Sequence, residues 1–401
     1  MDSVRTPLDL VLNDAPDRPV FCFRPARLEA AARWFRDGFP ARPFYAVKAN
    51  PSAHVLDTLW KAGIEAFDVA SDGEAERVAQ RFASAELAFM HPIKNRRAIA
   101  RAYHEFGCRR FVLDTQGELD KILDATGQAR DLTLLVRVGV SNQGATLPLT
   151  GKFGAREQDA PALLRATRAV SAELGVSFHV GSQALSPPAW HTAMADLSRL
   201  IVAAGVTVDI VDVGGGFPGH YGGLAPPALG DYAGVIAAAF DDMKVLENAA
   251  LWCEPGRALV AESESLLVRI EGTHDGALYL NDGGFGALYD VVHERWRFPV
   301  RALGAGGLIG GAMREWTVYG PTCDSADRFP EKLALPASLG EGDYLEFGNI
   351  GAYGRAMAGR FNGFGEYETV MTRDAPWPSL YDDEPLAAAP DTLTALTRGY
   401  P

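Results

Sequence analysis

The chain has 401 residues, 47% of them hydrophobic, and a formal net charge of −13 at pH 7. This size and apolar content predict a globular protein of two or three domains, and the negative charge argues against a nucleic-acid partner. We find no apolar run long enough to cross a membrane and no signal-peptide pattern in residues 1–7, so we expect a soluble, cytoplasmic protein.

The four cysteines are widely separated in the sequence and form no CxxC pair. This spacing indicates neither a zinc site nor a disulfide framework, and we expect no metal in the protein. They are Cys22, Cys108, Cys253 and Cys323.

Short β-rich runs alternate with helical segments from about residue 20 to residue 255. This alternation is typical of repeated β-α units with a parallel sheet. Helical periodicity is clearest over residues 27–36 and 162–174, and residues 139–159 look like a loop. The nine strand candidates are 20–23, 44–47, 66–69, 87–90, 110–113, 134–138, 176–180, 208–213 and 250–253. The last eight fit a closed (β/α)8 barrel, which leaves the first strand free to join another domain.

After residue 257 the sequence changes to shorter alternating runs that are broken by glycine and proline. This pattern predicts an antiparallel β domain, with strands at 266–270, 277–280, 315–319 and 344–347. We therefore expect a barrel over residues 20–257 and a β domain formed by residues 1–19 and 258–401.

Ligand-binding groups of a parallel barrel lie just past the carboxyl ends of its strands. Lys48 follows one strand directly, and on its own it reads as an ordinary surface charge. Asp68, His179, residues 214–216 and Glu254 also fall at or near strand ends, so they are expected to converge on one mouth. This convergence favours a functional role for Lys48.

Three consecutive glycines, Gly214 to Gly216, follow a strand and let backbone amides approach an anion such as a phosphate. The alternative is an ordinary flexible turn. The sequence also matches GxGxxG, but no helix is expected to follow, so a nicotinamide cofactor is not favoured. Glu254 is either a salt-bridged carboxylate or the partner of a cofactor's protonated ring nitrogen, and His179 is either a packed histidine or a ring that stacks on a cofactor.

Six motifs strongly resemble the ornithine, diaminopimelate and arginine decarboxylases of the alanine-racemase-like fold. They occur in the family's order and span nearly the whole chain, at residues 45–51, 178–183, 214–217, 254–257, 320–325 and 351–353. The resemblance implies a (β/α)8 barrel that binds pyridoxal phosphate, a C-terminal β-barrel or sandwich domain, and a homodimer with two active sites shared between subunits.

The resemblance also assigns roles to individual residues. It implies that Lys48 carries the cofactor as a Schiff base, that His179 stacks on its ring and that Glu254 holds the ring nitrogen protonated. It implies that Cys323 and Asp324 come from the other subunit. Glu74 is placed near the cofactor in a supporting role. The remaining cofactor-binding positions are Asp68, Arg137, Ser182, Gly215, Gly216, Gly256, Arg257 and Tyr353.

The reaction and the substrate follow from the same residues. A thiol in a polar turn makes Cys323 a candidate proton donor, while the alternative is a small buried residue. Asp290 and Asp324, with Tyr289 beside them, suit the distal ammonium of a diamino acid. Diaminopimelate decarboxylases usually carry Arg-Pro where this chain has residues 285–286.

We therefore expect decarboxylation of L-ornithine to putrescine, with L-lysine to cadaverine also open, in polyamine biosynthesis. Ornithine and lysine differ by one methylene, which is worth only about 1–3 kcal/mol in a binding pocket, so the motifs leave this choice open. The alternatives are a diaminopimelate decarboxylase, a racemase on the same barrel, and a non-catalytic regulator that keeps the fold.

Overall fold

The computed structural model describes residues 5–142, 144–149, 151–374 and 377–381, and it divides into two compact units. The barrel unit consists of residues 31–218 and 227–259, and the β unit consists of residues 1–30, 219–226 and 260–401. No helix in the described part of the chain is long and apolar enough to span a bilayer.

The barrel unit contains a parallel sheet of nine strands in the order β2-β12-β11-β9-β7-β6-β5-β4-β3. The strands are β2 (Arg42–Pro43), β3 (Tyr45–Ala46), β4 (Ala66–Val69), β5 (Glu86–Phe89), β6 (Arg110–Leu113), β7 (Thr133–Arg137), β9 (Glu173–Ser177), β11 (Ile210–Asp212) and β12 (Ala250–Cys253). The two outermost strands, β2 and β3, are separated only by Phe44, so they are two halves of one strand that closes the sheet on itself. This confirms the predicted (β/α)8 barrel.

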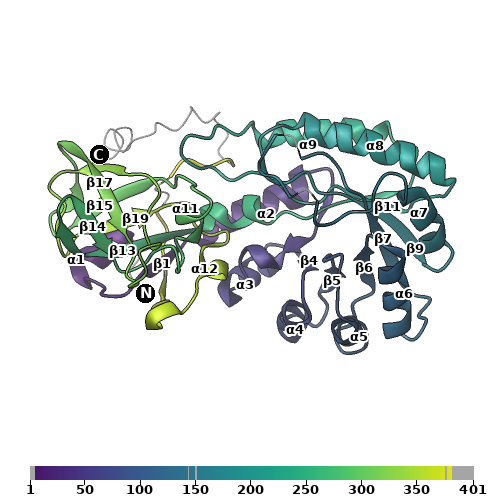
Figure 1. The fold of residues 1–401 in the computed structure, drawn as a ribbon, viewed down its shortest axis with the longest axis horizontal. Helices are drawn as coiled ribbons and strands as arrows, with labels where there is room; N and C mark the ends of the chain where they lie inside the picture. The colour runs from purple at the N-terminus through teal and green to yellow at the C-terminus, as the bar shows by residue number, and fades with distance from the viewer. Residues whose placement is uncertain (1–4, 143, 150, 375–376, 382–401) are drawn as a thin grey trace. The chain divides into compact units, whose positions relative to one another are not determined.

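Helices follow the strands in chain order and cover the outside of the barrel (Figure 1). Three of them begin with a side-chain cap in the loop that follows a strand: Ser71 accepts from Glu74 N, Asn95 from Ala98 N and Thr115 from Glu118 N. Each such cap stabilises the folded protein by about 1 kcal/mol. The helices are α3 (Ala53–Lys61), α4 (Asp72–Arg81), α5 (Arg96–His104), α6 (Gln116–Ala125), α7 (Ala160–Arg168), α8 (Pro188–Ala204) and α9 (Leu229–Asp241).

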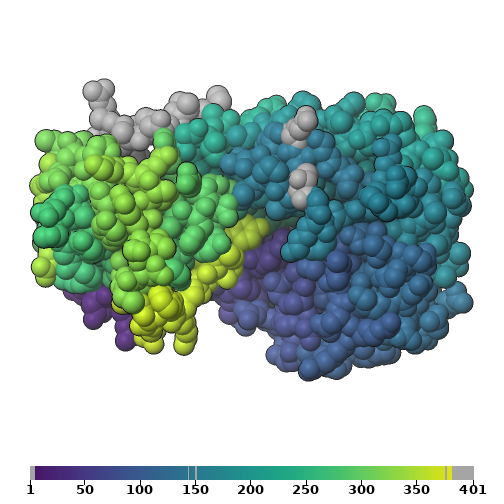
Figure 2. Space-filling view, in the orientation of Figure 1, coloured from purple at the N-terminus to yellow at the C-terminus, as the bar shows by residue number. Residues whose placement is uncertain are grey.

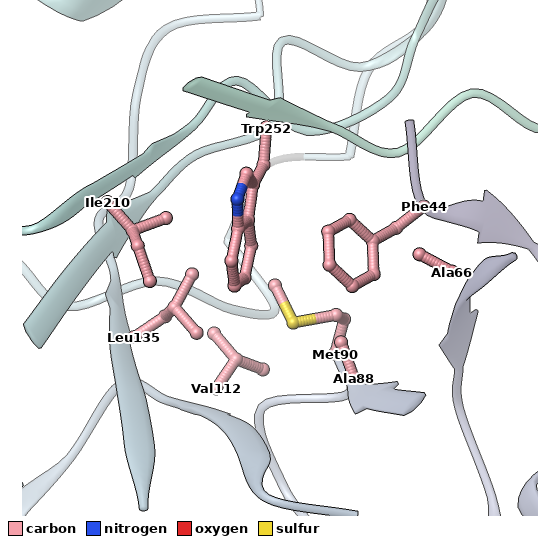
Figure 3. Packing of buried hydrophobic residues seen from close by; sticks show 8 residues of the cluster. All are labelled: Phe44, Ala66, Ala88, Met90, Val112, Leu135, Ile210 and Trp252. Carbon is pink, nitrogen blue, oxygen red and sulfur yellow. The ribbon is translucent and has the colours of Figure 1, made fainter. Parts of the chain in front are cut away.

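Apolar side chains from successive strands fill the inside of the barrel. The rings of Phe44 and Trp252 lie 4.5 Å apart between centroids, and Met90 and Leu135 pack in the same cluster (Figure 3). The interior is therefore a packed core, and polar side chains can act only beyond the strand ends.

The β unit is built around a second nine-stranded sheet. Its strands are β1 (Val20–Phe23), β13 (Glu264–His274), β14 (Ala277–Leu280), β15 (Val300–Gly304), β16 (Gly307–Ile309), β17 (Met313–Tyr319), β18 (Leu333–Pro336), β19 (Tyr344–Phe347) and β20 (Glu368–Met371). As expected for the spare first strand, β1 joins this sheet, where it pairs antiparallel with β13. Most pairs of this sheet are antiparallel, as expected, but β1 with β20 and β14 with β17 are parallel, so the sheet is mixed.

Short helices and a buried ion-pair network complete the β unit. Helix α1 (Pro7–Asn13) packs Leu10 and Val11 onto the sheet, and α2 (Pro25–Arg33) follows β1. Arg24 binds Glu346 and Asp374, each at 3.0 Å. The other short helices of this unit are α11 (Tyr289–Val292) and α12 (Gly354–Met357), whereas three of the four residues of α10 (Arg257–Val260) belong to the barrel unit.

Two expectations about chain segments were wrong. The helix expected over 162–174 ends at Arg168, because that side chain binds Asp209 and the carbonyls of Ser171 and Ala172, and the chain then enters β9 at Glu173. The segment 139–159, expected to be a loop, contains β8 (Ala145–Leu147), which pairs with β10 (Ser182–Ala184).

Candidate active site

Lys48 and Asp68 form an ion pair at the ends of neighbouring strands. Lys48 lies in a 3-10 turn (Val47–Ala49) directly after β3, and its Nζ is 2.8 Å from Asp68 Oδ2. The Asp68 side chain is only 1% exposed, whereas that of Lys48 is 44% exposed, and Asp68 Oδ1 has no hydrogen-bond partner. The pair thus presents an accessible amine that is held by a buried carboxylate.

Glu254 and Asp212 form a buried carboxyl pair at the ends of β12 and β11. Their side chains are hydrogen-bonded to each other, and Asp212 Oδ1 also accepts from Gly214 N at 2.9 Å. Burial raises the pKa of both groups, and the negative charge of Asp212 raises the pKa of Glu254 further. The two carboxyls therefore retain a proton, which Glu254 donates to Asp212.

His179 lies two residues beyond β9 as a neutral ring. Its Nδ1 accepts a hydrogen bond from Gly181 N at 3.0 Å, and its carbonyl accepts from Asn142 Nδ2 at 2.9 Å. Burial, followed by the charges of Arg137 and Lys48, lowers the pKa of His179 to about 3. The ring is therefore uncharged at neutral pH and suited to stacking on another flat group.

The glycine triplet between β11 and α9 has no room for side chains. A Cβ at Gly214 would lie 2.1 Å from the Phe178 carbonyl oxygen, and one at Gly216 would lie 2.4 Å from that of Gly181. Both have positive φ angles, 65° and 97°. At Gly215, a Cβ would be 2.7 Å from the Glu254 carbonyl oxygen and 3.3 Å from His179 Nε2. The triplet therefore brings bare backbone beside His179 and Glu254, as a phosphate cradle requires.

The remaining residues that were predicted for the barrel lie around this cluster. Ser182 begins β10, Arg137 ends β7 and Arg257 begins α10, where its side chain is buried. Gly256 allows close contact with the Lys48 turn, because its Cβ would lie 3.1 Å from Ala49 Cβ. Glu74, near the start of α4, accepts from Ala70 N at 2.7 Å, and the charges of Asp68 and Lys48 act on its carboxyl group.

Several of these groups lie close enough for their charges to shift one another's pKa values. The charges of both Asp68 and Lys48 act on Glu254, and those of Lys48 and Arg137 act on His179. An amine, a carboxyl pair, a neutral ring and a glycine cradle thus lie together. These are the groups that a phosphorylated pyridine aldehyde needs, so the barrel's residues fit pyridoxal phosphate.

In the β unit, Cys323 and Asp324 lie on an exposed loop between β17 and β18. They line a cavity of about 750 Å³ whose walls all belong to this unit, and Asp327, Tyr279 and Tyr319 line it too. Cys323 is the exposed cysteine of the chain, whereas the other three are buried. This corrects the alternative of a small buried residue at position 323.

Two other predicted residues, Tyr289 and Asp290, begin α11, and Asp290 is buried and does not line this cavity. Tyr353 has a left-handed backbone, with φ of 64°, directly before α12. The structure therefore brings Cys323 and Asp324 together but leaves Asp290 on a separate loop.

Sequence reasoning missed two buried carboxylates next to these groups. Asp212 could have been found by the rule that selected Asp68, because it also ends a barrel strand. Asp327 had no comparable signal, since it lies in an irregular loop and is buried only by tertiary contacts.

Comparison with known proteins agrees with this site. The pyridoxal-binding domain of the pyridoxal-dependent decarboxylases matches residues 26–261. A lysine/ornithine decarboxylase from Selenomonas ruminantium is 31% identical over 364 residues, which cover 87% of this chain and 88% of that protein.

Two further matches cover most of the chain. Antizyme inhibitor 2 from Xenopus laevis is 31% identical over 80% of this chain and 74% of its own length. The structure of a lysine/ornithine decarboxylase from Vibrio vulnificus in complex with cadaverine superposes with a TM-score of 0.77, at 28% identity, over 89% of this chain and 95% of the other. The chain belongs to the pyridoxal phosphate-dependent decarboxylases.

Proposed function

We propose that this protein decarboxylates L-ornithine to putrescine for polyamine biosynthesis and accepts L-lysine, giving cadaverine, as a second substrate. When bound, pyridoxal phosphate supplies the electron sink that stabilises the carbanion left when carbon dioxide departs. The relatives named above support a basic amino acid as substrate.

The observation that carries the substrate assignment lies at residues 285–286. A Cβ at Gly286 would be 2.0 Å from Asp282 Oδ1, and the Phe285 ring packs 5.1 Å from that of Phe361. These positions therefore offer neither an arginine nor space for one. A second carboxylate on the substrate, as in diaminopimelate, would lack the cation that it needs, whereas Asp290 and Asp324 suit a distal ammonium.

The barrel residues would hold the cofactor and the reacting end of the substrate. We assign Lys48 the covalent link, and Asp68 keeps its amine in place through the 2.8 Å ion pair. Glu254 would bind the protonated ring nitrogen, and its hydrogen bond with Asp212 would orient its carboxyl group. The glycine triplet, with Ser182, Arg257 and Tyr353, would bind the phosphate.

The intact set of reactive groups favours an enzyme over a non-catalytic regulator. A regulator would need neither the accessible Lys48 amine nor the exposed Cys323 thiol, yet both are present. A racemase would need a second base in place of a proton-donating thiol, so it is also disfavoured.

A panel assay for carbon dioxide release tests the substrate assignment. The holoenzyme is assayed with L-ornithine, L-lysine, L-arginine and meso-diaminopimelate, and kcat/KM is compared. We expect the highest value for ornithine and the next highest for lysine. A preference for diaminopimelate would refute the roles of Asp290 and Asp324.

We further propose that the active unit is a homodimer in which Cys323 of the partner subunit donates the proton to the substrate carbon. Three exposed apolar side chains, Met357, Phe361 and Phe364, support an interface on the β unit. They lie on the segment that is drawn in yellow on its surface (Figure 2).

Subunit mixing tests this arrangement. Lys48→Ala and Cys323→Ala proteins, each expected to have at most about a hundredth of the wild-type activity, are unfolded together and refolded in equal amounts. Random pairing makes half of the dimers mixed, and each mixed dimer has one intact site of two, so about a quarter of the activity should return. Sites formed within one subunit would restore none.

A further inference from the structure

A buried carboxylate, Asp327, connects two loops of the β unit. Its Oδ1 accepts a hydrogen bond from Gly284 N at 2.7 Å, and its Oδ2 accepts from Thr322 N at 3.0 Å and from Thr322 Oγ1 at 2.8 Å. The residue is only 1% exposed. Each oxygen of one carboxylate thus binds a different loop.

The two loops carry the residues to which the proposed function assigns substrate and proton chemistry. The first, residues 281–288, leads into α11 with Tyr289 and Asp290, and the second, residues 320–325, carries Cys323 and Asp324. Asp327 also fixes the second loop through its backbone, because its N donates to the Asp324 carbonyl at 3.0 Å and its carbonyl accepts from Gly320 N at 2.9 Å.

Two glycines make room for this carboxylate. A Cβ at Gly283 would lie 2.3 Å from Asp327 Oδ1, and a Cβ at Gly320 would lie 2.2 Å from the same atom. Neither glycine has a positive φ, so space and not backbone conformation requires glycine there. Both loops are therefore built to approach Asp327 closely.

Hydrogen bonds that do not involve Asp327 hold the C-terminal end of the first loop, at residues 287–288. Asp282 accepts from Leu288 N at 3.2 Å and from the Tyr367 hydroxyl at 2.8 Å, and that hydroxyl accepts from Ala287 N at 3.0 Å. These bonds hold the loop to the β20 side of the unit. Asp327 bonds this loop to the second one, at a point where Gly283 also packs against the backbone of Gly320.

We propose that Asp327 is a positioning residue, which holds the loop of Cys323 and Asp324 at a fixed spacing from the loop that leads to Asp290. This inference rests on the proposed function for the roles of those three residues. A carboxylate suits the task because it accepts from three donors at once, whereas an amide has one accepting oxygen and would turn its NH₂ towards N–H donors.

The test compares Asp327→Asn with a matched pair of variants at Thr322 and with a control at Asp374, all in the holoenzyme. Thr322→Val removes the hydroxyl bond to Asp327, and Thr322→Ser keeps it. Asp374→Asn removes a carboxylate elsewhere in the β unit, where it binds Arg24, and controls for general destabilisation. Cys323→Ala, alone and combined with Asp327→Asn, shows whether Asp327 acts through the thiol.

Amide hydrogen exchange is the readout that does not depend on activity. We expect Asp327→Asn to speed exchange at least tenfold in peptides covering both loops, Thr322→Val to do so less, and Thr322→Ser and Asp374→Asn to leave both loops unchanged. Unchanged exchange of residues 281–288 in Asp327→Asn would overturn the proposal whatever the activity.

Steady-state kinetics give the second readout. We expect Asp327→Asn to lower kcat for ornithine about tenfold and raise KM severalfold, but to lower kcat less than twofold in the Cys323→Ala background. An equal loss in both backgrounds, or loss of the dimer by sedimentation, would overturn the positioning role. If the wild type releases no carbon dioxide from any amino acid tested, the proposed function fails, while faster exchange in both loops still supports the connection.

Discussion

The end of the barrel and the loops of the β unit hold their reactive groups in opposite ways. In the barrel, Asp68, Asp212 and Glu254 are buried at the ends of strands, and burial raises the pKa of Asp212 and of Glu254. In the β unit, Cys323 and Asp324 are exposed, and the buried residue is Asp327 behind them. Rigid strands can hold charge directly, whereas exposed loops need a buried residue to position them.

The largest effect should follow from removing the barrel's amine. We expect Lys48→Ala to lower turnover on the order of a thousandfold or more, because no other group can take over a covalent role. The purified variant should also lack the visible absorption of the wild type. Lys61→Ala, on the exposed end of α3, is the control and should stay coloured and active. A coloured Lys48→Ala with covalently bound cofactor would place the link elsewhere.

Removing the thiol of the β unit should have the next largest effect. We expect Cys323→Ala to bind the cofactor normally but to lose about a hundredfold in kcat, since a positioned proton donor typically contributes 10²–10⁴-fold. Absorption spectra and carbon dioxide release measure the two properties separately. The neighbouring Ser325→Ala should keep near wild-type turnover. Full activity of Cys323→Ala would show that another group donates the proton.

Filling the glycine cradle should weaken cofactor binding moderately. In Gly215→Ala the added methyl group meets the Glu254 carbonyl and His179, and overpacking of this kind costs about 1–3 kcal/mol. We expect about tenfold weaker pyridoxal phosphate binding in a fluorescence titration of cofactor-free protein. Gly230→Ala, where a Cβ meets nothing within 4 Å, is the matched control. Equal affinities would argue against the cradle.

The smallest expected effect concerns the carboxyl pair and pH. A carboxyl whose pKa is raised by folding stabilises the folded state below its unfolded pKa, and this stabilisation is lost as pH rises through the folded pKa. In Asp212→Asn, stability should fall less as pH rises, because the negative charge that raises the pKa of Glu254 is gone. Each unit by which that pKa falls changes stability by about 1.4 kcal/mol.

Thermal unfolding of cofactor-free protein between pH 5 and pH 8 measures this effect. His179 acts in the opposite direction, because its lowered pKa makes stability rise with pH between about 3 and its ordinary value. His179 contributes equally in the wild type and in Asp212→Asn. The difference between the pH dependences of their melting temperatures therefore reports on the carboxyl pair of Asp212 and Glu254 alone. If the melting temperatures of the two proteins change with pH in the same way, Asp212 does not control the protonation of Glu254.

The barrel could be predicted from sequence because its signals are local and periodic. Apolar runs such as 66–69 and 110–113 coincide with β4 and β6, and the strand-end rule selected Lys48, Asp68 and Glu254 without any structure. The helix predicted over 162–174 is too long, because α7 ends at Arg168 without a glycine or proline to mark its end. Side-chain contacts of Arg168 are found there instead.

The β unit could be predicted less completely. Strands β15, β16, β18 and β20 have only three to five residues each, too few to show the apolar alternation on which a prediction depends. Asp212 ends a barrel strand and so was open to the strand-end rule, whereas Asp327 lies in an irregular loop and is buried only by partners elsewhere in the chain, which no local pattern encodes. The residue roles that follow from the family resemblance remain predictions for the experiments above.

The seam of the barrel, where the halves β2 and β3 meet β12 and β4, has a consequence for how the protein matures. Phe44 N and Ala46 N bond to the carbonyls of Cys253 and Pro255, so Lys48 and Glu254 come together only when segments about 200 residues apart have joined. A chain with an open seam cannot assemble the site. Cofactor added during refolding should therefore capture only fully closed barrels and, by mass action, raise their yield.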